Sequence, residues 1–448
     1  MRLAGFFLTL TLLCGSAFGY TTPNTNVVWT LADFVANSAG AVTGSGTNFA
    51  IHTNVWISAK DTLNIAPGTT VLTGEMPDFA YLIVQGTVIA AGTQIQPIRF
   101  TSSASRATNT TQFDRCLEIQ NPSSTQTVLN WVTFENCDIG FATFTTNSLS
   151  ISNCTFQLCN QGADVQGQNT TFSSCTFQNN GFASYPREGA GAYCWRGSPI
   201  FLNCNFANNT TGTNAGNWFG GGLCMYSVSN ALVQTCMFTN NRAQFGAGLA
   251  VSDCTNLTVR SCAFSANQII NYALSNNGDD AQIESSQNVV VERCPSLERI
   301  FYWQSSGRLV NNIFNSYWHD TGGFNGYGTF GCTDCSPLVA HNVMRYIYCF
   351  GSSSPVVANN VFSGDLESGY IQELSTNADP VVLNNRFVST AILYKDENST
   401  LLTNVTQINA LPGNSGNTQG SDIGLDTAKL VLTGNSPLFD AAFDGSNQ

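Results

Sequence analysis

The sequence predicts an all-β protein built as a single-stranded parallel β-helix, a solenoid of short strands with capped ends. A motif with cysteine two residues before phenylalanine recurs through the middle of the chain, as in Ile151-Ser-Asn-Cys-Thr-Phe156 and Phe172-Ser-Ser-Cys-Thr-Phe177. Copies follow one another at intervals of about 20 to 30 residues, which is typical of repeat architectures. Nothing between the copies has the periodicity of a helix, so a leucine-rich horseshoe is the less favoured alternative.

Each copy reads as two short strands joined by a tight turn. In the copy at 149–156, alternation directs Leu149 and Ile151 inward, and Cys154 and Phe156 inward after the turn. Asn153 stands at the turn, where asparagine tolerates a left-handed backbone. Coils stacked about 4.8 Å apart would therefore carry phenylalanine and cysteine ladders in the interior. Farther along, the motif becomes Asn-Asn-x-Phe, at Asn311-Asn312-Ile-Phe314, Asn359-Asn360-Val-Phe362 and Asn384-Asn385-Arg-Phe387.

The ends of the chain differ from the repeats. Residues 1–19 combine one basic residue, a short apolar run and Ala17-Phe-Gly19, which predicts a secretory signal peptide and an extracellular or cell-surface location. We expect an N-terminal cap at 20–50, the β-helix at 51–400 and a C-terminal cap or tail at 401–448. Within the first cap, Thr30-Leu-Ala-Asp33 predicts a helix start, with a surface strand as the alternative.

Charge and hydropathy exclude two classes of partner. The chain has 16 Lys and Arg residues and a net charge of −12, so we expect no nucleic acid, whose phosphates require a basic face. No stretch is long and apolar enough to predict a transmembrane segment.

The first coils carry a resemblance to known proteins. Leu63-Asn-Ile-Ala-Pro-Gly-Thr-Thr-Val71 and the alternating stretch Leu82 to Thr93 resemble the opening coils of bacterial secreted right-handed β-helix proteins, the pectate-lyase-like superfamily. The end, from Ser421 to Ala441, resembles the tail that closes such proteins. The resemblance implies a right-handed helix and engagement of an extracellular polysaccharide or surface glycan along a lateral groove near residues 279–345, as a lyase, a hydrolase or a binding protein.

The central copies resemble a second group. Gly189-Ala-Gly-Ala192 and Gly246-Ala-Gly-Leu249, together with Phe177-Gln-Asn-Asn180, resemble the repeats of polymorphic outer-membrane proteins. Those proteins are surface adhesins. This resemblance implies the alternative function, a non-catalytic adhesion or structural protein of the cell surface or matrix.

Asp279 and Asp280 are the first catalytic candidates. Asn276-Asn-Gly-Asp-Asp280 resembles the Gly-Asp-Asp strand of polygalacturonases, which implies that the two carboxyls act as acid and base or bind calcium, the candidate cofactor. The family's Asn-Thr-Asp, Gly-His-Gly and Arg-x-Lys motifs are missing, so a solvated turn stays open as the alternative.

A second group of candidates lies in an aromatic-rich stretch at 301–350. His319 follows Tyr317 and Trp318 and is the third catalytic candidate. Trp303, Tyr317, Trp318 and Arg345 are the candidate substrate-binding residues, because exposed rings can bind the faces of sugars. Core filling by some of the rings is the alternative.

The cysteines admit several interpretations. After removal of the predicted signal peptide, 15 of the 16 cysteines remain, so at least one lacks an intrachain partner. We expect the repeat cysteines to act as small buried apolar residues, although neighbouring coils place them within disulfide range. Cys332-Thr-Asp-Cys335 predicts a local disulfide or two free thiols, since a zinc site needs more ligands.

Overall fold

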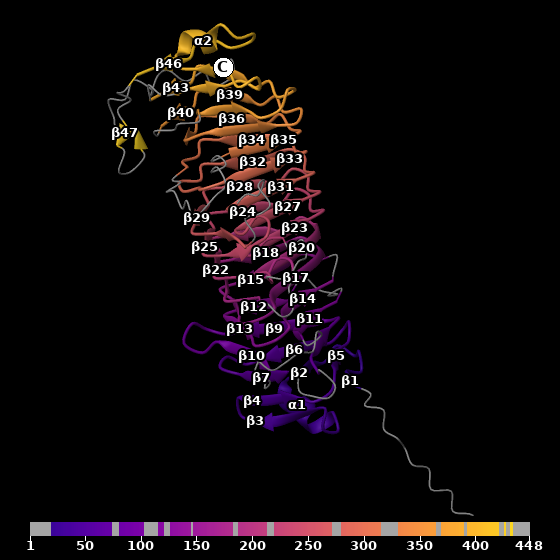
Figure 1. Cartoon of the computed structure of the whole chain (residues 1–448). Helices are drawn as coiled ribbons and strands as arrows, with labels where there is room; N and C mark the ends of the chain where they lie inside the picture. Colours follow the sequence, from indigo (N-terminus) through magenta and orange to yellow (C-terminus); the bar gives the residue numbers. More distant parts are fainter. Residues whose placement is uncertain are drawn as a thin grey trace, which may run out of the picture.

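The computed structural model describes residues 19–73, 80–102, 115–120, 126–144, 147–181, 187–212, 219–270, 279–314, 330–363, 369–388 and 392–420, and the short strands at 425–426 and 431–432. These residues form an elongated stack of coils with the first strands at one end and the last at the other (Figure 1). The signal peptide predicted at 1–19 lies almost wholly outside the described residues.

Three long sheets run along the stack, and most coils contribute one strand to each of them. Sheet A has sixteen strands within the described residues. They are, in order, β1 (Tyr20–Thr21), β5 (Val55–Ile57), β8 (Leu82–Val84), β11 (Arg115–Ile119), β14 (Ile139–Thr143), β17 (Gln161–Gln168), β20 (Ala192–Gly197), β23 (Leu223–Tyr226), β27 (Leu249–Ser252), β31 (Ala281–Glu284), β33 (Ile300–Trp303), β35 (Phe330–Thr333), β38 (Ile347–Phe350), β41 (Ile371–Glu373), β44 (Tyr394–Lys395) and β45 (Leu401–Leu402).

Sheet B forms the second face, with fourteen strands in the described part of the chain. They are β2 (Val28–Trp29), β6 (Thr62–Ile65), β9 (Thr87–Ala91), β12 (Val128–Asn130), β15 (Leu149–Ser152), β18 (Thr170–Ser173), β21 (Ile200–Leu202), β24 (Leu232–Gln234), β28 (Thr258–Arg260), β32 (Val289–Glu292), β34 (Gly307–Val310), β36 (Leu338–Ala340), β39 (Val356–Ala358) and β42 (Val381–Leu383).

Sheet C is the third face and is interrupted part-way. Its strands are β3 (Val42–Ser45), β4 (Asn48–Ile51), β7 (Thr70–Thr73), β10 (Ile98–Ser102), β13 (Val132–Glu135), β16 (Thr155–Gln157), β19 (Thr176–Gln178), β22 (Asn205–Ala207), β25 (Met237–Thr239) and β29 (Ala263–Ser265). Single bridges through 296–314 connect it to a shorter sheet of β37 (Val343–Met344), β40 (Val361–Phe362), β43 (Arg386–Phe387) and β46 (Thr418–Gln419). Two small pairs complete the strands, β26 (Arg242–Ala243) with β30 (Gln268–Ile269) and β47 (Leu425–Asp426) with β48 (Val431–Leu432).

Neighbouring coils pair in parallel, and the register keeps like side chains in line. Phe134 pairs with Phe156, which pairs with Phe177 in the next coil. Their rings stack with centroids 5.2 Å and 4.6 Å apart. Met344 aligns with Phe362, as the sequence predicted. The ladder of phenylalanines is therefore confirmed, and burial of these large rings is the main favourable contribution to the stack.

The repeat cysteines come shortly before this ladder in the chain, and most of them lie two residues before one of its phenylalanines. They are buried free thiols, as expected for small apolar residues: Cys154, Cys175, Cys204, Cys236, Cys262 and Cys294. The turn residue before each has a left-handed backbone, with φ of 54° at Asn153. From Asn312 onward the cysteine position is occupied by asparagine, whose amide donates to the next coil's amide oxygen; Asn312 Nδ2 lies 3.0 Å from Asn342 Oδ1. This asparagine ladder lies one residue after the turn position.

A second asparagine ladder lies at another corner, between sheets C and A. It follows the Phe-x-x-Asn motifs and runs through Asn180, Asn209, Asn241 and Asn267, with amide nitrogen to amide oxygen distances of 2.9 to 3.0 Å. The glycines of the Gly-rich turns lie against it. A Cβ at Gly222 would stand 3.3 Å from Asn241 Cγ and 2.5 Å from the next coil's backbone oxygen. These repeats therefore keep glycine because the amide ladder fills the corner.

Helix α1 (Leu31–Asn37) packs at the N-terminal end of the stack (Figure 1). Thr30 is its N-cap and forms a capping box with Asp33, which confirms the predicted start. Phe34 is buried and stacks on Trp29 at 5.3 Å. The helix thereby covers the apolar end of the first coils. At the other end, α2 (Val405–Asn409) buries Ile408.

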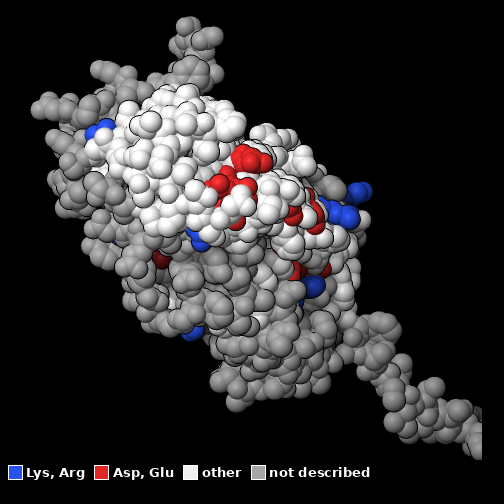
Figure 2. Space-filling model, turned by 45° about the horizontal axis from the view of Figure 1, so that its top comes forward, with Lys and Arg blue, Asp and Glu red and all other residues white. Residues whose placement is uncertain are grey.

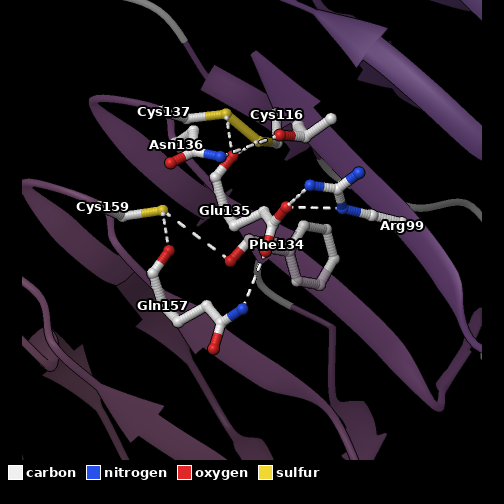
Figure 3. A network of polar contacts seen from close by, with 9 residues as sticks. Arg99, Cys116, Phe134, Glu135, Asn136, Cys137, Gln157 and Cys159 are labelled. Carbon is white, nitrogen blue, oxygen red and sulfur yellow. Dashed lines mark hydrogen bonds and ion pairs between the residues drawn. A yellow bond between two sulfur atoms is a disulfide. The ribbon is translucent and has the colours of Figure 1, made fainter. Parts of the chain in front are cut away.

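A polar network and a disulfide join coils near residue 135 (Figure 3). Glu135 is buried, pairs with Arg99 of the preceding coil and accepts a hydrogen bond from Gln157 Nε2 at 2.7 Å. Cys116 and Cys137 form a disulfide with a Cα–Cα distance of 6.2 Å. Cys332 and Cys335 are both free thiols, one of the two outcomes that their spacing allowed.

Candidate functional site

The outer face of sheet A carries the side chains that are best placed to meet a ligand. Its strands alternate, so that Ile283 and Tyr302 enter the core while Gln282 and Phe301 point away from it. The outward residues in register with Gln282 and Phe301 form a column along the sheet. Most of them are nevertheless buried: Ile83, Glu118, Ala142, Asp164, Cys224, Ala250, Gln282, Phe301, Tyr348 and Gln372.

Two residues farther along each strand, a second outward column is more exposed. We call it the aromatic column; its members on eight successive coils are Gln166, Trp195, Tyr226, Ser252, Glu284, Trp303, Thr333 and Phe350. Tyr226 is 38% exposed and Trp303 is 40% exposed. Because directly paired strands set the spacing, six steps from Trp195 to Phe350 span about 29 Å. The column therefore combines two exposed and two half-buried rings with hydrogen-bonding side chains along one line.

Carboxyl groups lie beside the N-terminal part of this column. Asp164 on β17 accepts both Gln166 contacts at 3.1 Å, and it pairs in register with Tyr193 on β20. Burial raises the pKa of Asp164 and of Glu188. Both carboxyls also interact with the hydroxyl of Tyr193, whose pKa is raised chiefly by burial.

A second pair of carboxyls lies two and three coils beyond Tyr193. The Asp253 carboxylate accepts a hydrogen bond from Tyr226 and, as the largest cause, raises the pKa of that phenol. Burial, followed by the charge of Asp253, raises the pKa of Glu284. Glu284 therefore lies within the aromatic column, and Asp253 lies beside it.

The arginines near these groups are already engaged. Arg115 forms an ion pair with Glu118, and Arg187 with Asp138. Arg196 lies over the ring of Trp195, with its guanidinium carbon 4.4 Å from the ring centroid. Figure 2 shows a largely uncharged surface with local groups of acidic side chains.

Asp279 and Asp280 occupy different environments. Asp280 is fully buried at the end of the asparagine ladder between sheets C and A, where Oδ1 accepts from Asn267 Nδ2 at 3.0 Å and Oδ2 accepts from the backbone of Glu298. Burial raises its pKa to about 8. Asp279 lies 3.5 Å from Arg299, and burial raises its pKa as well. The two carboxyls are neighbours, but one belongs to the interior and its catalytic assignment stays a prediction.

The other predicted site residues divide in the same way. Trp303 belongs to the aromatic column. Arg345 is half-buried and, with Arg299, acts electrostatically on the phenol of Tyr346, so these two arginines lie on the Asp279 side. His319, Tyr317 and Trp318 lie outside the described residues.

Three carboxyls that could hold a cation gather near the C-terminal end: Glu373, Asp396 and Glu397, with oxygens within 4.8 Å of one another. Oxygen ligands suit calcium. Both oxygens of Glu373 already accept hydrogen bonds, from the Tyr394 hydroxyl and from the Glu397 backbone at 3.2 Å. The donor set is therefore satisfied within the protein, and calcium stays a prediction.

Comparisons with known proteins agree with this architecture. A family model described as a right handed beta helix region matches residues 98–211 and 187–314. The chain is a right-handed parallel β-helix protein. The right-handed β-helix fold, predicted from the first coils, is thereby confirmed, while the resemblance to outer-membrane protein repeats stays a prediction.

Several solved structures share the fold of this β-helix protein at low identity. The periplasmic alginate epimerase AlgG is 9% identical with a TM-score of 0.33, covering 83% of this chain and 72% of that chain. The A-module of the mannuronan C-5 epimerase AlgE6 from Azotobacter vinelandii is 10% identical with a TM-score of 0.32, covering 88% and 99%. Pectate lyase Pel9A is 13% identical with a TM-score of 0.26, covering 88% and 84%. No curated protein sequence matches the chain.

The aromatic column of this β-helix protein was not predicted from the sequence. A signal for it exists: four-residue segments that follow the Gly-rich turns or their counterparts end in the outward residue, as in Ala192–Trp195 and Leu223–Tyr226. The variable spacing between copies hides this alignment, because loops of different length separate equivalent strands. As far as the chain is described, it contains no helix with the length and apolar character needed to cross a bilayer.

Proposed function

We propose that this protein is exported and binds an extracellular polysaccharide along the aromatic column of sheet A. The observation that carries the proposal is the alignment of Trp195, Tyr226 and Trp303 in one register line of the sheet. A chain of sugars offers apolar ring faces at regular intervals, and aromatic rings bind such faces while their polar edges stay hydrated.

The residues between the rings suit the same ligand. Ser252, Glu284 and Thr333 provide hydroxyl and carboxylate groups for sugar hydroxyls. All members lie on hydrogen-bonded strands and not on loops, so their positions are fixed before binding. Such preorganisation lowers the entropic cost of binding a long ligand.

Binding to a panel of neutral, acidic and amino polysaccharides tests the proposal, by affinity electrophoresis followed by calorimetry. We expect retention by at least one polymer, and about tenfold weaker binding for Trp303→Ala, since one ring contributes on the order of 1 kcal/mol. Leu338→Ala is the matched control, because Leu338 is 36% exposed but lies on sheet B. Absence of binding to every polymer, or equal losses in both variants, would refute the proposal.

Catalysis by Asp279, Asp280 and His319 is a separate proposal, supported by the raised pKa values of the two aspartates, which favour a proton-holding carboxyl. Assays for new reducing ends and for unsaturated products, on any polymer that binds, test it. Asp279→Asn should abolish activity while leaving binding intact. Activity that survives Asp279→Asn would exclude the assignment.

A further inference from the structure

The charge around the aromatic column carries an inference about the class of glycan, and this inference depends on the proposed function. Four carboxyls lie in or beside the column: Asp164 and Glu188 act on the phenol of Tyr193, Asp253 accepts a hydrogen bond from Tyr226, and Glu284 is itself a member of the column. Three of them are partly desolvated, which raises their pKa values. A desolvated carboxylate gains more from a cationic partner than one in bulk water does.

Basic groups offset these carboxyls only in part. Arg115 and Arg187 form ion pairs with Glu118 and Asp138, and their charges also lower the pKa of Asp164, although burial raises it more. The Arg196 guanidinium lies over Trp195 and demonstrates that a cation is accepted at a ring of the column. The net charge of −12 adds a long-range field of the same sign.

We propose that the aromatic column selects a glycan with protonated amino groups, a polymer of amino sugars, over neutral and acidic polymers. Its sugar faces stack on the exposed rings of Tyr226 and Trp303, and its ammonium groups meet the neighbouring carboxylates and the rings. An acidic polymer would bring its carboxylates against those of the protein, at an electrostatic cost.

Calorimetry with three oligosaccharides of equal length tests this: β-1,4-linked glucosamine, its N-acetylated counterpart and galacturonic acid. We expect the glucosamine oligomer to bind at least tenfold more tightly than the other two at low ionic strength, and to lose much of that advantage at high salt. Equal or tighter binding of the N-acetylated or galacturonic oligomer would overturn the inference, as would tight galacturonic binding that requires calcium and is lost with a chelator.

The two proposals fail differently. Binding of the N-acetylated oligomer without preference for its amino counterpart would overturn the selectivity and leave polysaccharide binding in place. Absence of binding to these oligomers and to the whole polysaccharide panel would overturn both.

A charge-only substitution locates the selectivity. Glu284→Gln should weaken binding of the glucosamine oligomer several-fold more than it weakens binding of the N-acetylated oligomer. Glu292→Gln is the matched control, because Glu292 is equally half-buried on the same coil but ends a strand of sheet B. A Glu284→Gln protein that keeps its full preference, or an equal loss in both variants, would contradict the assignment.

Discussion

The coils before residue 280 and the coils after it both carry an asparagine ladder, but at different corners of the stack. In the earlier coils an amide ladder from Asn180 to Asn267 lies between sheets C and A, and cysteines occupy the corner between sheets B and C. In the later coils, from Asn312 to Asn417, the amide ladder occupies the cysteine position. Each region thus carries one amide ladder, and the two ladders lie at different corners of the stack.

The change of corner alters which side chains fit at the neighbouring position of sheet A. Beside the ladder from Asn180 to Asn267, the neighbouring residue of sheet A in successive coils is a glycine: Gly191, Gly222 and Gly248. The same register position after the switch holds Arg299 and Tyr346. A Cβ at these glycines would lie 2.3 to 2.7 Å from the next coil's backbone oxygen and 3.1 to 3.3 Å from a ladder amide, so both the neighbouring backbone and the ladder restrict the position to glycine. After the switch, the position holds bulky side chains.

The largest expected effect follows from removing a ladder amide. Asn342 donates to Leu309 O at 2.8 Å and to Asn360 Oδ1 at 3.0 Å, and its own Oδ1 accepts from the backbone and side chain of Asn312. Asn342→Ala would leave several buried groups without partners, and we expect a loss of about 3 to 5 kcal/mol in the free energy of unfolding. Denaturant unfolding measures this.

Asn311 provides a matched control, because it lies one residue before the ladder amide of Asn312. Asn311 is exposed in the left-handed turn, and serine occupies the equivalent turn position at Ser174 and Ser261. Asn311→Ser should therefore change the free energy of unfolding by about 0.5 kcal/mol or less. If Asn342→Ala is equally mild, the amide ladder does not support the later coils.

The next largest effect concerns the glycine beside the first ladder. A Cβ at Gly222 would lie 2.5 Å from the Gly248 oxygen, so Gly222→Ala must displace the neighbouring coil, and we expect a loss of about 2 to 4 kcal/mol by thermal or denaturant unfolding. At Gly40, with φ of 95°, a Cβ would meet nothing within 4 Å, so Gly40→Ala carries only a backbone cost of about 1 kcal/mol. Equal losses would show that space beside the ladder is not limiting.

The ladders were predictable from the sequence, and their change of corner was not. Cysteine before Phe156 and asparagine before Phe314 stand at the same motif position, so their stacking follows from strand alternation alone. Asp279 and Asp280 were read as a catalytic pair because two adjacent acids resemble a known motif. The sequence does not reveal that Asp280 lies in register with the end of a ladder that starts at Asn180, since that depends on loop lengths over the intervening coils. For the same reason the aromatic column was missed.

A pH effect on stability tests the buried carboxyl of Asp280, which ends the ladder from Asn180 to Asn267. Burial raises the folded-state pKa of Asp280 from an ordinary value near 3.8 to about 8. Between these values the folded state keeps a proton that the unfolded state has lost, so the free energy of unfolding decreases as pH rises, by up to about 1.4 kcal/mol per pH unit. Asp280→Asn removes this dependence, and unfolding curves from pH 4 to 8 should become flatter than those of the native protein. Unchanged slopes would place the titration elsewhere.

The smallest expected effect tests the cysteine corner of the earlier coils. Cys236 is buried, and its sulfur is only a weak acceptor, 3.4 Å from the backbone nitrogen of Cys204. Cys236→Ala removes one sulfur and leaves a small cavity, without creating the set of unpartnered amides that Asn342→Ala creates. We expect a loss of about 1 kcal/mol in the free energy of unfolding. A loss as large as that of Asn342→Ala would mean that the cysteine ladder supports its coils by more than packing, and that the two corners are equivalent in energy despite their different chemistry.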